Sequence, residues 1–181
     1  MSVIELRPPK HFVIPELEPV TMLLGPIQGA PDWQHDAVEE LEIQTDQRYI
    51  RRLYVANPRA DYLPGEFDYD TQVDWEGAHI DRAMRYGSIV VWFAKQDHDL
   101  EYEAGRPYAK TTMKELQRVL AWIDCHQLDP DAVAFGIEPG FEDRLRYERK
   151  HITKRGIPIL DNLEEVVDKA TGFIQEIVGA S

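Results

Sequence analysis

The chain has 181 residues, of which 43% are hydrophobic and 29% are charged, and its net charge is −13 at pH 7. This length suits a single domain with a substantial core. An acidic surface repels nucleic-acid phosphates and anionic membranes at long range, which argues against polymeric nucleic acid and membranes as partners.

The sequence favours a cytoplasmic protein. No stretch is long and apolar enough for a membrane helix, and the first ten residues, MSVIELRPPK, lack the apolar core of a secretory signal. Cys125 is the single cysteine, so an internal disulfide is excluded. We expect Cys125 to be a small buried side chain.

Strand and helix patterns alternate along the chain. Residues 1–19 contain four prolines and are expected to form an extended arm, followed by one domain over 20–181. Short apolar runs predict strands at residues 20–24, 52–56, 88–94, 132–136 and 156–160. Apolar periodicity and capping residues predict helices at about 31–41, 73–86, 112–126, 142–155 and 163–177.

This alternation predicts a doubly wound α/β domain, with a mostly parallel five-stranded sheet and helices on both faces. Residues 89–94 are apolar throughout, as is typical of a central strand. Ligands of open α/β sheets bind outside the carboxyl ends of the strands. We therefore expect the functional residues at 25–28, 57–59, 94–97 and 136–140, and at the helix starts that follow.

The turn after the first of these strands reads Leu-Gly-Pro-Ile-Gln-Gly-Ala over residues 24–30. Two glycines beside a helix start can let backbone N–H groups approach a ligand. The turn matches neither the dinucleotide-binding nor the Walker pattern. The structural alternative is a tight turn that needs positive φ.

Glu115 lies near the start of the helix after the central strand. Thr112 and Glu115 have the spacing of a capping box, so one interpretation makes Glu115 a helix cap. The functional interpretation is a carboxylate that the helix dipole keeps ionised at the open end of the sheet. Such a carboxylate can attack an anomeric carbon and form a covalent glycosyl intermediate.

Carboxylates also gather at the start of the helix near residue 73. Asp74 and Glu76 flank Trp75 there. A carboxylic acid can protonate the ring nitrogen of a leaving nucleobase, and Trp75 could stack on a base. The alternatives are an acidic, solvated helix start and a tryptophan in the core.

Four segments together resemble the nucleoside 2-deoxyribosyltransferase-like family. They are LGPIQGAPDWQ at 24–34, VANPR at 55–59, QVDWE at 72–76 and YAKTTMKEL at 108–116. The resemblance covers about residues 21–160. It implies a flavodoxin-like sheet, transfer of a deoxyribosyl group between bases, and Glu115 as the nucleophile.

The strand ends and the helix starts that follow them also predict a set of residues that contact substrate. They are Gly25, Pro26, Ile27, Gln28, Trp33, Asn57, Arg59, Trp75, Thr111 and Thr112. The better-studied transferases carry an acidic residue a few positions before the nucleophile, whereas this chain has none over 108–112. We therefore expect the helper acid to be Glu76 or Asp74.

Related members hydrolyse deoxynucleoside monophosphates, so two alternatives accompany transfer: an N-glycosidase, and a nucleotide-binding module without catalysis. The expected partners are a nucleoside or nucleotide, a free nucleobase and further copies of the chain in a homo-oligomer. The histidines show no metal-binding spacing, and we expect neither a metal nor a cofactor. Residues 97–99 are expected to be a solvated loop.

Overall fold

A computed structural model describes residues 2–60, 62, 66–102, 105–141 and 145–179. Its strands are β1 (Val3–Leu6), β2 (Val20–Leu24), β3 (Leu53–Ala56), β4 (Gly87–Phe93), β5 (Val133–Ile137) and β6 (Ile159–Leu160). The helices are α1 (Trp33–Gln47), α2 (Tyr69–Tyr86), α3 (Lys110–Asp124), α4 (Arg146–Lys154) and α5 (Leu163–Gly179), and a 3₁₀ turn, η1 (Pro130–Ala132), precedes β5.

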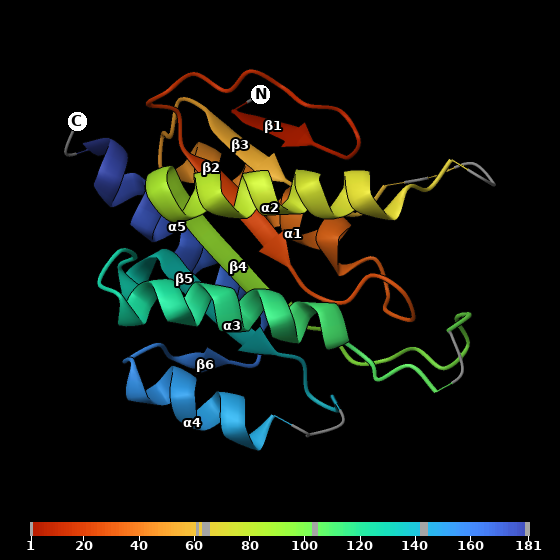
Figure 1. The fold of residues 1–181 in the computed structure, drawn as a ribbon. Coiled ribbons are helices and arrows are strands. Elements are labelled where there is room, and N and C mark those ends of the chain that lie inside the picture. The colour runs from red at the N-terminus through yellow and green to blue at the C-terminus, as the bar shows by residue number, and fades with distance from the viewer. Residues whose placement is uncertain (1, 61, 63–65, 103–104, 142–144, 180–181) are drawn as a thin grey trace.

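The strands form one parallel sheet in the order β1-β3-β2-β4-β5-β6. Without the edge strand β1, the remaining order β3-β2-β4-β5-β6 is that of flavodoxin-like folds. Every residue of β4 is buried, which fits its place between β2 and β5. The predicted doubly wound α/β architecture is therefore confirmed, with β4 as a central strand (Figure 1).

The expected count of five strands is wrong, because the sheet has six. Residues Val3–Leu6 pair with Leu53–Ala56 in parallel and form the edge of the sheet. They lie inside the segment that we predicted as an extended arm. A four-residue strand beside prolines gives too short a pattern to be distinguished from an arm by its sequence.

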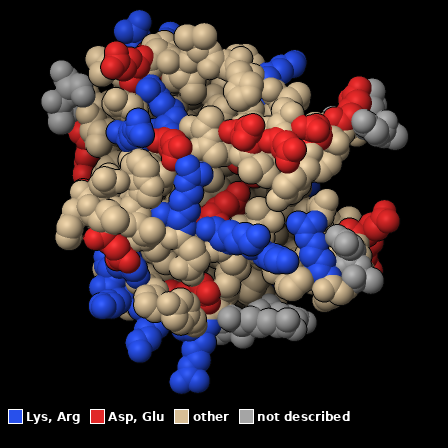
Figure 2. All heavy atoms as spheres, in the orientation of Figure 1, with Lys and Arg blue, Asp and Glu red and all other residues tan. Residues whose placement is uncertain are grey.

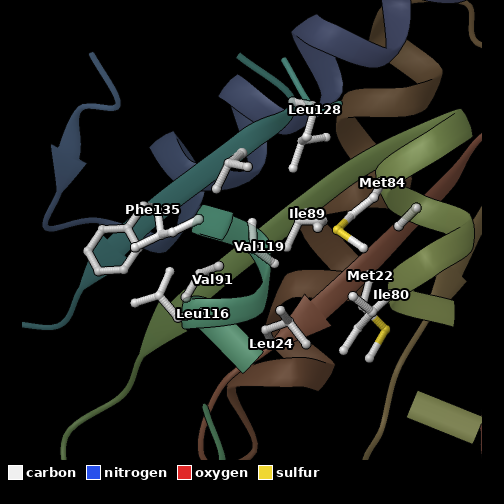
Figure 3. Close-up of a cluster of buried hydrophobic side chains, with 14 of the residues drawn as sticks. Met22, Leu24, Ile80, Met84, Ile89, Val91, Leu116, Val119, Leu128 and Phe135 are labelled. Carbon is white, nitrogen blue, oxygen red and sulfur yellow. The ribbon is translucent and has the colours of Figure 1, made fainter. Parts of the chain in front are cut away.

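Helices cover both faces of the sheet. Helices α1 and α5 pack on one face, and α2 and α3 on the other (Figure 1). Figure 3 shows the second of these layers, where Met22 and Leu24 of β2 and Ile89 of β4 meet Ile80 of α2 and Leu116 of α3. This apolar layer fixes α2 and α3 side by side over the middle of the sheet.

Two helices begin earlier than the sequence predicts. Helix α2 begins at Tyr69 because the Asp68 side chain accepts a hydrogen bond from the N–H of Thr71 at 2.7 Å. Helix α3 begins at Lys110. Of the helix predicted at 142–155, residues 142–144 lie outside the described residues.

Cys125 is exposed, so the expectation that it is buried is wrong. It follows the last residue of α3 and its backbone N–H bonds to the carbonyl of Ala121, which leaves the side chain at the solvent-facing end of the helix. None of the helices in the described ranges combines the length and apolarity needed to span a bilayer.

Candidate active site

A cavity of about 350 Å³ opens at the carboxyl edge of the sheet. It lies between the turn after β2, the first turns of α2 and α3, and the chain before α3. Its lining residues are Gly25, Pro26, Ile27, Gln28, Pro58, Ala60, Tyr62, Phe67, Tyr69, Gln72, Val73, Glu76, Tyr102, Arg106, Ala109, Lys110, Thr111, Thr112 and Glu115.

A larger groove, of about 800 Å³, lies at the opposite edge of the sheet. It is lined by Pro19, Gly87 and Ala132, which stand at the starts of β2, β4 and β5. Ligands of open α/β sheets bind at the carboxyl ends of the strands. We therefore place the candidate site in the smaller cavity.

The turn after β2 is held close to the sheet. A Cβ atom on Gly25 would lie 2.4 Å from both Trp33 Cζ2 and the Trp92 carbonyl oxygen, so only glycine fits there. The Pro26 carbonyl accepts hydrogen bonds from Trp33 Nε1 at 2.9 Å and from Gln34 Nε2 at 3.4 Å. Trp33, expected to contact substrate, is instead 2% exposed and supports this turn from behind.

Arg59 also binds this turn rather than the cavity. Its Nη2 donates to the carbonyls of Ile27 at 3.2 Å and Pro31 at 3.0 Å, and its Nε lies 3.0 Å from the Asp32 carboxylate. Nε also donates to Gln34 Oε1 at 3.0 Å. Arg59 does not line the cavity, so its role in the structure is to fix the turn that forms one wall.

Three other expected site residues lie outside the cavity lining. Asn57 is fully buried, and its Nδ2 donates to Glu5 Oε1 at 2.7 Å, which ties β3 to β1. Trp75 is also fully buried and donates from Nε1 to the Lys10 carbonyl at 2.9 Å, so it is a core residue. Asp74 is exposed to solvent.

Glu115 lies in the second turn of α3, because the helix begins at Lys110. Ala109 takes the N-cap position with a φ of 56° and without a side-chain hydrogen bond. Thr112 is inside the helix and buried, so the capping-box interpretation of Glu115 is wrong. The neighbouring Leu116 is fully buried, which turns this part of the helix toward the sheet.

Glu76 reaches the same place from α2, and its carboxyl group hydrogen-bonds to that of Glu115. The Gln72 side chain, one turn earlier on α2, donates from Nε2 to Glu76 Oε1 at 2.6 Å. The same Nε2 donates to the Pro58 carbonyl at 3.0 Å, and Gln72 Oε1 accepts from the Tyr62 hydroxyl at 2.5 Å. The two carboxyl groups are therefore the last two members of a chain of four polar side chains, which begins with Tyr62 and Gln72.

Burial and mutual repulsion keep a proton on this pair. Loss of solvent around the Glu115 carboxyl, the charge of Glu76 and the hydrogen bond to Glu76 together raise the pKa of Glu115 to about 8, and the Arg118 cation opposes them. Burial also raises the pKa of Glu76, while hydrogen bonds from Gln72 and Glu115 act in the other direction. The pair therefore holds a proton at neutral pH, contrary to the expectation that Glu115 simply stays ionised.

An ion pair joins α2 and α3 next to the two acids. Figure 2 shows acidic side chains over α2 and basic ones over α3 in this view. Arg118 of α3 forms an ion pair with Asp81 of α2 at 2.5 Å. A Cβ atom on Gly77 would still lie 3.6 Å from Arg118 Nη1, so the arginine passes close to the α2 backbone without a clash.

The chain before α3 forms the wall opposite α2. The N–H of Asp97 donates to the Gly29 carbonyl at 2.8 Å, and Arg106 Nη1 donates to Gln28 Oε1 at 2.9 Å. Gly29 has a φ of 69°, and the Tyr102 ring packs where its Cβ would be. The contact with Tyr102 explains why the turn needs its second glycine, Gly29. In the loop expected to be solvated at 97–99, His98 is exposed.

The sequence did not identify five of the lining residues that shape the cavity, which are Tyr62, Phe67, Gln72, Tyr102 and Arg106. Gln72 had a usable signal, because residues four apart on a helix face each other and Gln72 precedes Glu76 by one turn. Tyr102 and Arg106 come from a loop without periodicity, so only the fold brings them to the turn after β2.

Eight of the expected site residues do line the cavity; they are Gly25, Pro26, Ile27, Gln28, Glu76, Thr111, Thr112 and Glu115. Within the described part of the chain, no three histidine, cysteine or acidic side chains come together as a metal site. The sequence matches no protein-family model and no curated protein.

Proposed function

We propose that this protein cleaves the N-glycosidic bond of a nucleoside-like substrate in the cavity between α2 and α3, with Glu115 as the nucleophile and Glu76 as the acid. The hydrogen-bonded pair of largely desolvated carboxyl groups carries the proposal. Two acidic groups whose surroundings separate their protonation are typical of enzymes that use one as an acid and the other as an anion.

The reaction begins with a proton shift along the existing hydrogen bond. Glu115 gives its proton to Glu76, so that Glu115 becomes a carboxylate and Glu76 becomes a carboxylic acid. A Glu115 oxygen then bonds to C1′ of the sugar while the C1′–N bond breaks and its electron pair passes to the base. Glu76 transfers its proton to a ring nitrogen of that base, which leaves neutral.

The second half returns the sugar to an acceptor. Glu76, now a carboxylate, removes the proton from an incoming nucleobase, whose nitrogen attacks C1′ and releases Glu115. Water in the acceptor position would give hydrolysis instead. The cavity volume of about 350 Å³ falls in the range of small-molecule sites, and aromatic side chains of Tyr62, Phe67 and Tyr102 line it. These rings can stack on a base.

A phosphorylated substrate is a second candidate, and two cationic side chains favour it. Arg106 and Lys110 both line the cavity. Lys110 is the first residue of α3, five residues before Glu115, so its Cα lies about 7.5 Å from that of Glu115 along the helix axis. A helix start with two cations can bind the 5′-phosphate of a nucleotide whose C1′ faces Glu115.

The deciding experiment is incubation with a panel of deoxynucleosides and deoxynucleoside monophosphates, with and without a free acceptor base. Chromatography distinguishes base exchange from hydrolysis. Glu115→Gln should abolish either reaction, and Asp74→Asn, which changes an exposed carboxylate outside the cavity, is the control. The absence of any turnover across the panel would contradict the enzymatic proposal and would favour the alternative of a nucleotide-binding module without catalysis.

The covalent step can be trapped separately. A 2′-fluoro-arabino nucleoside slows the oxocarbenium-like transition states and lets the glycosyl ester accumulate. Mass spectrometry of the digested protein should find the adduct on Glu115. An adduct on any other residue would contradict the assignment of the nucleophile.

A further inference from the structure

We propose that Gln72 is a positioning residue that holds Glu76 as the proton acceptor of the carboxyl pair, and that Tyr62 fixes the Gln72 amide in the required orientation. The inference rests on the proposed function for its catalytic consequence. Its physical content, the location of a proton, can be tested without any substrate.

The orientation of the Gln72 amide follows from its contacts. The Pro58 carbonyl can only accept a hydrogen bond, so the atom 3.0 Å from it must be the amide nitrogen. The amide oxygen then faces the Tyr62 hydroxyl, which must donate to it. Burial and the charges of Glu76 and Asp68 raise the pKa of Tyr62, so its hydroxyl keeps the proton that it donates.

This orientation determines what Gln72 offers to Glu76. Its second N–H points at Glu76 Oε1 at 2.6 Å, so that oxygen is an acceptor. A hydrogen bond from an amide favours the ionised form of a carboxyl group. Glu76 is therefore stabilised as the anion, and the shared proton stays on Glu115 until substrate enters.

Among the described residues, three cationic side chains act on the pair or line its cavity. Arg118 acts on Glu115 from α3, and the charges of Glu76 and Asp68 both act on Tyr62. Arg106 and Lys110 line the same cavity. Gln72, by contrast, donates a hydrogen bond directly to the Glu76 carboxyl group.

The chain contains a matched control for Gln72. On α1, Gln44 donates from Nε2 to Glu40 Oε1, also four residues apart and also at 2.6 Å. Gln44 and Gln72 are both 7% exposed. Gln44→Leu therefore removes the same contact from a helix that does not line the cavity.

The test is a pH titration of the glutamate side-chain carboxyls by ¹³C NMR, with Glu76 and Glu115 assigned from the Glu76→Gln and Glu115→Gln spectra. In Gln72→Leu, the titration midpoint of Glu76 should rise by about one pH unit, because a hydrogen bond to a charged group is lost. Gln44→Leu should leave Glu76 and Glu115 unchanged. Tyr62→Phe removes one hydroxyl and should raise the Glu76 midpoint by a smaller amount.

Tyr62→Phe keeps the inference testable if Gln72→Leu does not fold. An unchanged Glu76 midpoint in every folded variant of Gln72 or Tyr62 would overturn the positioning role. A shifted midpoint in a protein that turns over no substrate would contradict the proposed function and still support the positioning role. In an active protein, the acid limb of the kcat/KM profile should move upward with the Glu76 midpoint, whereas a purely structural defect lowers the rate without moving it.

Discussion

The carboxyl groups of Glu76 on α2 and Glu115 on α3 hydrogen-bond to each other at the edge of the cavity. Two carboxyl groups that share a hydrogen bond cannot both ionise readily. The pair therefore carries one proton over a wide pH range, and its two ionisations belong to the pair as a unit.

The two acids should differ in their dependence on the leaving base. A 7-methylguanine base leaves without needing a proton, because its ring already carries a positive charge. Glu76→Gln should be slow on ordinary deoxynucleosides and recover much of its rate on 7-methyl-2′-deoxyguanosine, whereas Glu115→Gln should be slow on both. Steady-state rates on the two substrates measure this. Equal recovery in both variants would show that the roles are assigned wrongly.

The stability of the protein should fall as the pH rises toward 8. The pKa of Glu115 is raised from 4.5 to about 8 in the folded protein, so the folded protein binds this proton more tightly than the unfolded chain does. Its contribution is fully present below the unfolded value and is lost as the pH rises through the folded value, by at most about 1.4 kcal/mol per pH unit. Urea unfolding of wild type between about pH 5 and 8 should show this slope.

Glu115→Gln has no such proton to lose, so its free energy of unfolding should change less steeply over the same range. Asp74→Asn, a change at an exposed carboxylate, should keep the wild-type slope. Parallel slopes for Glu115→Gln and wild type would mean that Glu115 is ionised in the folded protein at neutral pH.

Arg59→Lys should destabilise the turn after β2. The guanidinium donates to several carbonyls of this turn at once, whereas an ammonium cannot reproduce its planar geometry. We expect a loss of about 1–3 kcal/mol in the free energy of unfolding, together with a higher KM. Arg51→Lys, at an exposed arginine on the opposite edge, is the control. A similar loss in both variants would argue against the role of Arg59.

Gly25→Ala should destabilise the protein by about 1–3 kcal/mol, because the added methyl group would overlap Trp33 and the Trp92 carbonyl. Gly172→Ala is the opposite case. A Cβ atom at this position in α5 meets no atom within 4 Å, and alanine favours a helix by about 1 kcal/mol over glycine. Thermal melts should move in opposite directions, and a stable Gly25→Ala would contradict the packing of the turn.

The protein should form a homo-oligomer through the rim of the cavity. Phe67, just before α2, is 53% exposed, and Tyr69, its first residue, is 65% exposed. Light scattering at micromolar concentration should give a mass above that of one chain, and Phe67→Ser with Tyr69→Ser should reduce it. A monomeric wild type would contradict this prediction.

The sequence predicted most of the fold because its apolar runs are long and regular. The central strand and the helices around it followed from residues such as those of 89–94, which are buried on both faces. The strand at Val3–Leu6 was missed because its partner, β3, lies almost fifty residues later and leaves no local pattern.

The candidate site was only partly predictable. Glu76 and Glu115 could be named as acids near helix starts, but their hydrogen bond depends on the packing of α2 beside α3. Trp75 and Arg59 were expected to contact substrate because they stand near strand and helix ends. The structure shows each serving as support, since a side chain at such a position can turn either toward the cavity or behind it.

The pairing of β1 with β3 also sets an order of events during synthesis. Residues Val3–Leu6 leave the ribosome well before Leu53–Ala56, their partners in the sheet. At about 5–20 residues per second, the intervening stretch takes roughly 3–10 s to be made. The Lys10 carbonyl is without its hydrogen-bond donor for longer still, because Trp75, whose indole donates to it, is synthesised after β3. Residues Val3–Leu6 therefore lack their partner strand for several seconds, in which chaperones that bind nascent chains can reach them.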